Sequence, residues 1–366
     1  MDRTLLEAVP PGEILADELQ AREWSQAEFA EILGRPTQFV SEIVSGKKEI
    51  TRESAAQIGA ALGTSPELWL DMQNAYLLHK QAQSAATQRQ LEEVRRRARL
   101  NSLAPISVLR RRGLIAGDTL DDLEASLRDL LEVQSLDEEP VFLAAARRSN
   151  DDVPLTPTQL AWLAAARKRA RRMQVDQYNK KLAQLLAQEV ASIVREPRAF
   201  SDLPSVFAEA GVRLVYVEAL PSSKMNGATF LLDEDMSKPV IALSGRGKRL
   251  DVVLFTLLHE LAHLIRGDVR PGEMVIDEEA HTLGDEDAAN DIASRWAIPG
   301  GLPSPDGPVR SQWIAEHARN AKVHPIVVVG QLQNRGDLDW RTQLAKGAPT
   351  VTAELNEWNE VSITSN

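Results

Sequence analysis

Two histidines, four residues apart in an apolar stretch, constrain this chain more than any other feature of its sequence. His259 and His263 lie within residues 251–265, and residues 252–258 are almost wholly apolar. Such a run predicts a buried helix, and a spacing of four places both imidazoles on one of its faces. Because unpaired buried polar groups are costly, the fold has to supply a partner for these side chains.

Glu260 completes the pattern His-Glu-x-x-His. In this arrangement two neutral imidazole nitrogens bind Zn²⁺, and the glutamate accepts a proton from the attacking water. The residues therefore predict a zinc centre with His259 and His263 as ligands and Glu260 as general base. The alternative is a core helix whose histidines are satisfied without a metal.

A third ligand is needed, and the motif that would supply a further histidine is absent, because Arg266 and Val269 stand where it requires glycine and histidine. A carboxylate from a following helix is the remaining source. We assign Glu286, which shares a helix face with Asn290, while the small Ala289 lets two helices approach closely. Asn290 either orients His259 or His263 through a hydrogen bond or is an ordinary helix-surface residue. The alternative ligands are Asp285, Asp287, Glu278 and Glu279.

Strand patterns precede the apolar helix at residues 212–218, 228–232 and 239–243. Helices followed by a small sheet and more helices predict an α+β domain. We expect the strand at 228–232 to hold an extended peptide by backbone pairing. The apolar run 326–332 contains Gly330 and fits either a strand or a buried helix. His324 before it is a candidate to stabilise an oxyanion, with His281 as the alternative; otherwise both are ordinary histidines.

Residues 200–335 resemble the ImmA/IrrE metallopeptidases. The resemblance rests on KPVIALS at 238–244, FTLLHELAH at 255–263, NGATF at 226–230 and ExxAN at 286–290. It implies a compact gluzincin-like zinc fold that cleaves or inactivates partner repressors, with Glu286 as ligand and Glu260 as base. Asp291 and Ile292 stand where the family typically carries a large apolar residue, a departure that leaves the site intact.

Residues 11–78 have the pattern of short helices punctuated by glycines. Ser25 and Glu28 form a predicted capping box, and Gly34 falls where a turn requires positive φ. Val40 and Ile43 have the spacing that docks a second helix on the first. The segment therefore predicts a helix-turn-helix whose second helix, about 37–45, enters the major groove. Residues 46–51 resemble the loop after the recognition helix in HigA-type antitoxins and Cro/C1-like repressors.

The predicted DNA contacts fall into two groups. Exposed polar residues on the second helix are suited to base edges, and basic residues after it are suited to phosphates. The set is Arg35, Thr37, Gln38, Ser41, Lys47, Lys48 and Arg52. The segment is nevertheless acidic overall, so a module used only for protein contacts is the alternative. A homodimer on a two-fold operator would let two weak basic patches cooperate.

The composition of the chain restricts its possible metal chemistry, its nucleic-acid binding and its cellular location. The 366 residues include no cysteine, which excludes disulfides and thiolate metal sites. The net charge of −11 argues against general nucleic-acid binding. The first residues show no apolar signal core and no run is long enough for a membrane helix, so we expect a cytoplasmic protein without membrane contact. The basic run 167–172 is expected to be a solvated helix face.

The sequence as a whole predicts a multidomain protein. Its parts are an all-α helix-turn-helix domain at 11–78, a helical middle region at 79–195 of unclear role, an α+β gluzincin-like zinc peptidase domain at 196–340, and a tail at 341–366. We expect a transcriptional regulator that binds operator DNA and whose peptidase cleaves a regulatory protein. The alternative is a HigA-like antitoxin or repressor that binds DNA and a toxin, with a metal-binding domain that does not cleave.

Overall fold

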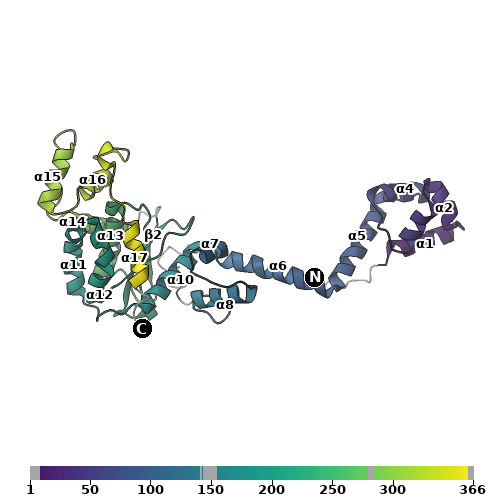
Figure 1. Ribbon diagram of the computed structural model, residues 1–366, viewed down its shortest axis with the longest axis horizontal. Coiled ribbons are helices and arrows are strands. Elements are labelled where there is room, and N and C mark those ends of the chain that lie inside the picture. The colour runs from purple at the N-terminus through teal and green to yellow at the C-terminus, as the bar shows by residue number, and fades with distance from the viewer. Residues whose placement is uncertain (1–8, 141, 143–154, 279–283, 362–366) are drawn as a thin grey trace. The chain divides into compact units, whose positions relative to one another are not determined.

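The structure is a computed structural model that describes residues 9–140, 142, 155–278 and 284–361 (Figure 1). It divides into two compact units, Met1–Ala98 and Arg99–Asn366. Residues 79–98 of the expected middle region thus belong to the first unit and residues 99–195 to the second. Among the described residues, no helix is both long and apolar enough to span a membrane.

The N-terminal unit is helical throughout. Its helices are α1 (Pro11–Ala21), α2 (Gln26–Leu33), α3 (Thr37–Val44), α4 (Arg52–Leu62) and α5 (Pro66–Gln83), followed by α6 (Ala85–Leu103). Fully buried side chains of Leu15, Phe29, Val40 and Ile58 form its core. The long exposed helix expected at 79–101 is interrupted at Ser84, whose backbone is extended between α5 and α6.

The predicted local signals of the helix-turn-helix are confirmed. Ser25 accepts a hydrogen bond from the Glu28 backbone N–H, and the Glu28 side chain accepts one from the Ser25 backbone N–H. Gly34 ends α2 with φ +64°, a left-handed conformation that glycine adopts without strain. Val40 and Ile43 are buried against α2 as expected. The chain therefore turns between α2 and α3 as the sequence predicts.

The C-terminal unit surrounds a small mixed sheet with helices. Before the sheet stand α7 (Ile106–Arg111), α8 (Leu120–Leu131), α10 (Pro157–Arg172), α11 (Lys180–Ile193), η1 (Pro197–Asp202) and α12 (Leu203–Glu209). The strands are β1 (Arg213–Tyr216), β2 (Met225–Leu231), β3 (Pro239–Leu243) and β4 (Met274–Glu278), with η2 (Leu232–Glu234) between β2 and β3. The remaining helices are α13 (Leu250–Arg266), α14 (Gly284–Ala297), α15 (Ser311–Ala321), α16 (Pro325–Asn334), η3 (Gln343–Ala345) and α17 (Thr352–Val361).

The strand order is β1-β3-β2-β4, with β1 parallel to β3 and the other neighbours antiparallel. Three of these strands were expected, whereas β4 was not. Strand β2 pairs on both sides, since Ala228 lies opposite Ala242 in β3 and Ile276 in β4. The expectation that residues 228–232 hold a peptide by backbone pairing is therefore wrong, because both edges of β2 are already occupied. The run 326–332 forms helix α16 rather than a strand.

Each face of the sheet carries a hydrophobic core. On one face Leu214, Ile241 and Leu243 pack with helix α13 and the helices around it. On the other face Phe230 and Ala242 pack with α7, α8 and α10. Helix α10 is also held to the end of β1, because the Trp162 indole N–H donates to the Val217 carbonyl at 2.7 Å. The described residues 99–140 and 155–172 are thus a structural layer of this unit.

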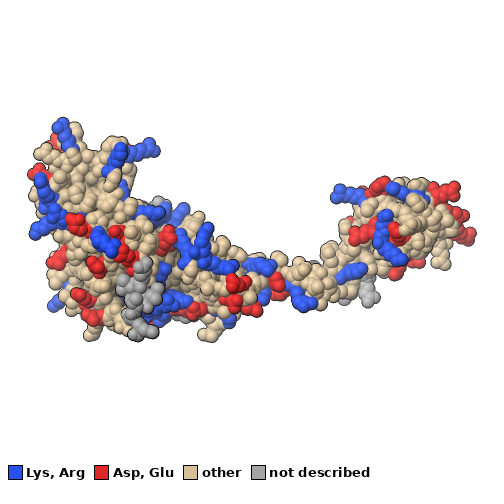
Figure 2. Space-filling model, viewed as in Figure 1, with Lys and Arg blue, Asp and Glu red and all other residues tan. Residues whose placement is uncertain are grey.

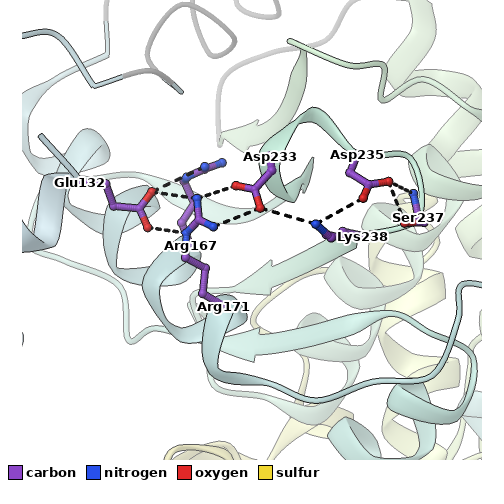
Figure 3. Close-up of polar contacts among 7 residues, drawn as sticks. All are labelled: Glu132, Arg167, Arg171, Asp233, Asp235, Ser237 and Lys238. Atoms are coloured by element: carbon purple, nitrogen blue, oxygen red, sulfur yellow. Dashed lines mark hydrogen bonds and ion pairs between the residues drawn. The ribbon is translucent and has the colours of Figure 1, made fainter.

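An ion-pair network fastens this helical layer to the connection between β2 and β3 (Figure 3). Arg171 of α10 lies 2.6 Å from both Glu132 and Asp233, and Asp233 continues to Lys238 at 3.7 Å. Arg167 lies 3.7 Å from Glu132 and packs against the Phe230 ring. The basic run at 167–172 is therefore more than the solvated face predicted, since Arg167 is buried and joins two layers of the fold.

Candidate functional site

Helix α13 carries the histidine pair through the middle of the C-terminal unit. It begins after Arg249, whose guanidinium donates to Asp251 in the first turn at 2.9 Å, and it ends at Gly267 with φ +87°. Most of its residues are buried, as its apolar sequence requires. Because it packs against the sheet on one side and α14 and α16 on others, the helix is surrounded, and its polar side chains are removed from bulk water.

The two imidazoles face one another. His259 and His263 are 4% and 2% exposed, and their Nε2 atoms lie 3.0 Å apart. Two nitrogens bound to one tetrahedral zinc at about 2.0–2.1 Å would lie about 3.3 Å apart. The pair is therefore close to the spacing that a shared cation requires.

Oxygen atoms on neighbouring elements orient both rings from behind. The Nδ1 atom of His259 lies 3.0 Å from Oδ1 of Asn290, and Nδ1 of His263 lies 2.9 Å from Oδ2 of Asp268. An oxygen acceptor at Nδ1 favours the tautomer whose proton is on that nitrogen and leaves the Nε2 lone pair for a metal. Asp268 was not anticipated from the sequence, although its place just after the Gly267 cap could have suggested it.

Glu260 is sealed in the core beside the pair. Its side chain has no solvent exposure, its Oε2 accepts a hydrogen bond from Thr229 Oγ1 at 2.6 Å, and its Oε1 has no hydrogen-bond partner among the described residues. Burial, and after it the charge of Asp277, raise the pKa of Glu260 to about 7 against the opposing effects of the two histidines and the Thr229 hydrogen bond. A buried carboxylate oxygen without a partner, next to two facing imidazoles, fits a group that exchanges a proton with a bound water.

Gly227 of β2 makes room for this carboxylate. A Cβ atom at position 227 would lie 2.5 Å from Glu260 Oε1 and 2.9 Å from its Cγ. Since such contacts are far inside van der Waals distance, any other residue would displace Glu260. The sequence resemblance included this glycine without revealing its role.

A cleft of about 250 Å³ opens beside His259, between α13, α14 and α16. Its walls include Phe255, Val327 and Trp340, and its polar lining includes Asn226 and Asp277. Asn290 lines it as well, so the cleft reaches the residue that orients His259. A substrate group could therefore lie next to the histidine pair.

The other predicted site residues are distributed as follows. Glu286 lies in the first turns of α14, four residues before Asn290, but its side chain falls outside the described residues. The same holds for the side chains of Asp285 and Glu278. Glu279 and His281 are outside the described residues altogether, whereas Asp287 is exposed. Ala289 is fully buried, in keeping with a close approach of α14 and α13.

His324 is not brought to the histidine pair by any described contact. It caps α16, where its Nδ1 accepts a hydrogen bond from the Ile326 backbone N–H at 3.1 Å. Burial lowers the pKa of His324 below its ordinary value, opposed by Glu196 and Asp251. One ring nitrogen is thus committed to the helix end, which explains why a histidine precedes Pro325.

On the N-terminal unit, α3 presents its polar side outward. Thr37, Gln38 and Ser41 are exposed on α3, and Lys47 and Arg52 are exposed beyond it. The Gln38 amide donates to Glu42 at 2.8 Å, a contact that DNA would have to replace. On the face of this unit that Figure 2 shows, Lys and Arg side chains are interspersed with Asp and Glu side chains.

Arg35 and Lys48, the other two predicted DNA contacts, interact with side chains of their own unit. Arg35 pairs with Glu53, donates to Gln57 at 3.1 Å, and lies 5.3 Å from the Phe39 ring centroid. Lys48 lies 4.7 Å from the same ring and 3.8 Å from Glu42. Both cations stand at the edge of the α3 surface, with their charge partly balanced inside the unit.

Comparisons with known proteins agree with this helical unit. Residues 15–69 match the helix-turn-helix family. The HTH-type transcriptional regulator YddM of Escherichia coli K12 is 34% identical over 68 residues, which is 19% of this chain and 72% of that protein.

Two similar solved structures are both 32% identical and both cover 24% of this chain. The Pseudomonas aeruginosa antitoxin HigA with the higBA promoter is covered over 92% of its length, with a TM-score of 0.22. A Coxiella burnetii addiction module antidote protein of a HigA family is covered over 95%, with a TM-score of 0.23.

Proposed function

The chain belongs, through residues 15–69, to the helix-turn-helix family of DNA-binding transcriptional regulators, and we propose that its C-terminal unit is a zinc-dependent peptidase that cleaves a regulatory protein. The support for the peptidase comes from the side chains of the C-terminal unit. The observation that carries it is the facing pair of Nε2 atoms, 3.0 Å apart, beside the buried and unpartnered Oε1 of Glu260.

His259 and His263 would hold the metal, with Glu286 as the expected third ligand. Zinc bound there would supply a Lewis acid that activates water and polarises the scissile carbonyl. Glu260 is placed to take a proton from the attacking water and to return it to the leaving amine. Thr229 holds one oxygen of Glu260 and thereby leaves the other for this exchange. Asn290 and Asp268 keep the imidazoles in the required orientation.

The substrate backbone would pair with β4. This strand has β2 on one side only among the described strands, whereas β2 itself has no free edge. Because Thr229 and Gly227 of β2 contact Glu260, β4 is the next strand outward from the general base. An extended peptide added to β4 would run beside the catalytic helix and could place a side chain in the cleft at His259.

In the N-terminal unit, Thr37, Gln38 and Ser41 would read base edges, and Lys47 and Arg52 would contact phosphates. Because few cations stand free there, one copy would bind DNA weakly, and a homodimer on a two-fold operator would supply the missing affinity. The alternative is an antitoxin-like protein that binds operator DNA and a toxin without cleaving it. Both proposals include binding to operator DNA. They differ in whether the C-terminal unit cleaves a partner protein.

Metal content and cleavage separate them. We expect about one zinc per chain by elemental analysis in the wild type and little in His259→Ala. His317→Ala, a matched histidine that stacks on Trp313 of α15, should keep the metal. The full-length Glu260→Gln variant should hold zinc and retain a partner protein that the wild type cuts into fragments, identified by mass spectrometry.

Each outcome decides between defined alternatives. Equal zinc content in the wild type and His259→Ala would overturn the metal centre. A zinc-loaded wild type that releases the retained partner intact would overturn the peptidase and favour the antitoxin-like alternative. Cleavage that Glu260→Gln performs as fast as the wild type would remove Glu260 from the mechanism.

A further inference from the structure

The C-terminal unit contains a second and larger cavity, away from the histidine pair. It has a volume of about 530 Å³ and is bounded by α10, α12, β1 and α17, which lie in one unit in Figure 1. Its apolar walls include Leu114, Leu130, Leu214 and Trp358. Small-molecule sites commonly have volumes of about 300–1,000 Å³ and mostly apolar walls, so this cavity has the dimensions of a ligand site.

The charged side chains that line this cavity are all cationic, beside the neutral polar side chains of Gln174, Ser205 and Asn359. Lys168, Arg169 and Arg172 of α10 contribute to it, and among the described residues that line it none is acidic. The three positions fall within two turns of α10, so their charges converge on one wall. A cavity lined by three cations and by no described carboxylate attracts an anion rather than a neutral or cationic molecule.

These charges are poorly compensated within the fold. Arg169 is half-buried and donates to the Tyr216 backbone carbonyl. Burial lowers the pKa of Arg169 below its ordinary value, Tyr216 raises it, and Arg172 lowers it further. No carboxylate of the described residues pairs with Arg172, and Lys168 pairs only with Asp129, which is 69% exposed. Arg169 and Arg172 thus have no carboxylate partner among the described residues, and their positive charge is available to a ligand.

We propose that this cavity binds a small organic anion with an aromatic or aliphatic body. Arg169 and Arg172 would bind the anionic group, since guanidinium groups match carboxylates, phosphates and sulfonates in geometry. Leu214 and Trp358 would enclose the apolar body. The walls come from α10 on one face of the sheet and from α12 and α17 on the other side, so a bound anion would connect layers of the unit that carries the zinc centre.

Two dyes that share an apolar body test this proposal. 8-Anilinonaphthalene-1-sulfonate carries an anionic group, and N-phenyl-1-naphthylamine is its uncharged counterpart. Fluorescence titration of the full-length protein should show the sulfonate binding about tenfold more tightly than the neutral dye, as expected for one charge-assisted contact. Because Arg169 and Lys168 remain, Arg172→Gln should reduce that preference, and Arg172→Glu should reduce it further. Both variants leave the fold intact because Arg172 is exposed.

Two further variants locate the binding and correct for overall charge. Lys181→Gln and Lys181→Glu make the same charge changes on an exposed residue of α11 outside the cavity, and they should leave both affinities unchanged. Ala208→Phe on α12 would fill the cavity and should weaken both dyes. Equal affinity of the two dyes for the wild type would overturn the proposal. So would an Arg172→Glu variant that matches Lys181→Glu, or an Ala208→Phe variant that binds as the wild type does.

Discussion

On α3 of the N-terminal unit Thr37, Gln38 and Ser41 are exposed, whereas on α13 of the C-terminal unit His259 and His263 are almost sealed from solvent. Exposed polar residues can be held in place without partners, because water satisfies them. Buried polar groups depend on partners from other elements, here Asn290, Asp268 and Thr229, and the Glu260 Oε1 atom is the exception described above. Single residues on the exposed side of α3 can therefore be replaced independently. The buried histidines of α13 depend on all of their partners together.

The largest expected difference concerns metal removal. A chelator should destabilise the C-terminal unit alone, by about 4 kcal/mol if free zinc is present at about 1,000 times its Kd beforehand. The N-terminal unit should melt unchanged, because its predicted contacts involve no metal. Differential scanning calorimetry of the wild type with and without chelator measures this, and His259→Ala is the control that should not respond. If the chelator lowered the melting temperature of both units, the prediction that only the C-terminal unit depends on a metal would be wrong.

Gly227→Ala should be the next largest effect. The added Cβ would meet Glu260 Oε1 at 2.5 Å, and overpacking of this kind costs about 1–3 kcal/mol of the free energy of unfolding, measured in urea. In a Glu260→Ala background the same change should cost clearly less, because the colliding group is gone. Gly307→Ala, at a position with open space and no left-handed φ, should be nearly neutral. An equal cost in both backgrounds would show that the collision is not the cause.

Gln38→Ala tests the exposed surface. Loss of a base contact should weaken operator binding about tenfold, which corresponds to about 1.4 kcal/mol, and should relax specificity at one base pair. Electrophoretic mobility shift on the protein's own promoter measures this. Gln20→Ala, an exposed glutamine on α1, is the matched control. If the wild type shifts no fragment of that promoter, the predicted DNA contacts fail together.

The smallest effect is expected at the helix cap of α2. Ser25→Ala removes the acceptor of the Glu28 N–H and should cost about 1 kcal/mol of unfolding free energy by thermal denaturation. Hydrogen bonds from Ser25 lower the pKa of Glu28, so the contribution is present near neutral pH and is lost as the pH falls through that lowered value. Ser25→Ala should flatten this acid dependence, and Ser45→Ala should not. An unchanged acid dependence would exclude the capping box as its source.

The sequence could predict what depends on local spacing. The capping box at Ser25, the left-handed Gly34 and the helix through His259 and His263 follow from contacts within a few residues along the chain. The sequence could not show that β4 lies outside β2, because strand order depends on contacts between distant segments. For the same reason Gly227 under Glu260 and the packing of α10 against the sheet emerged only from the fold.

The candidate site was predictable to the same extent. The residues of the motif itself were found from their spacing, and Asn290 was weighed as a residue that orients a histidine. Asp268 was missed, because a carboxylate in a loop after a helix has no distinctive pattern. The convergence of Lys168, Arg169 and Arg172 on one cavity was also hidden, since their run looked like an ordinary solvated helix face.

The strand order carries a consequence for substrate choice. If the C-terminal unit is the proposed peptidase and its substrate pairs with the edge of β4 that is free among the described strands, a polypeptide would be cut there only after it has become extended enough to add a strand to the sheet. A well-folded repressor would pass untouched, and the same repressor with a loosened linker or a frayed terminus would be accepted. Selectivity would then follow the conformational freedom of the target as much as its residues, and the regulator would sense when another protein begins to unfold.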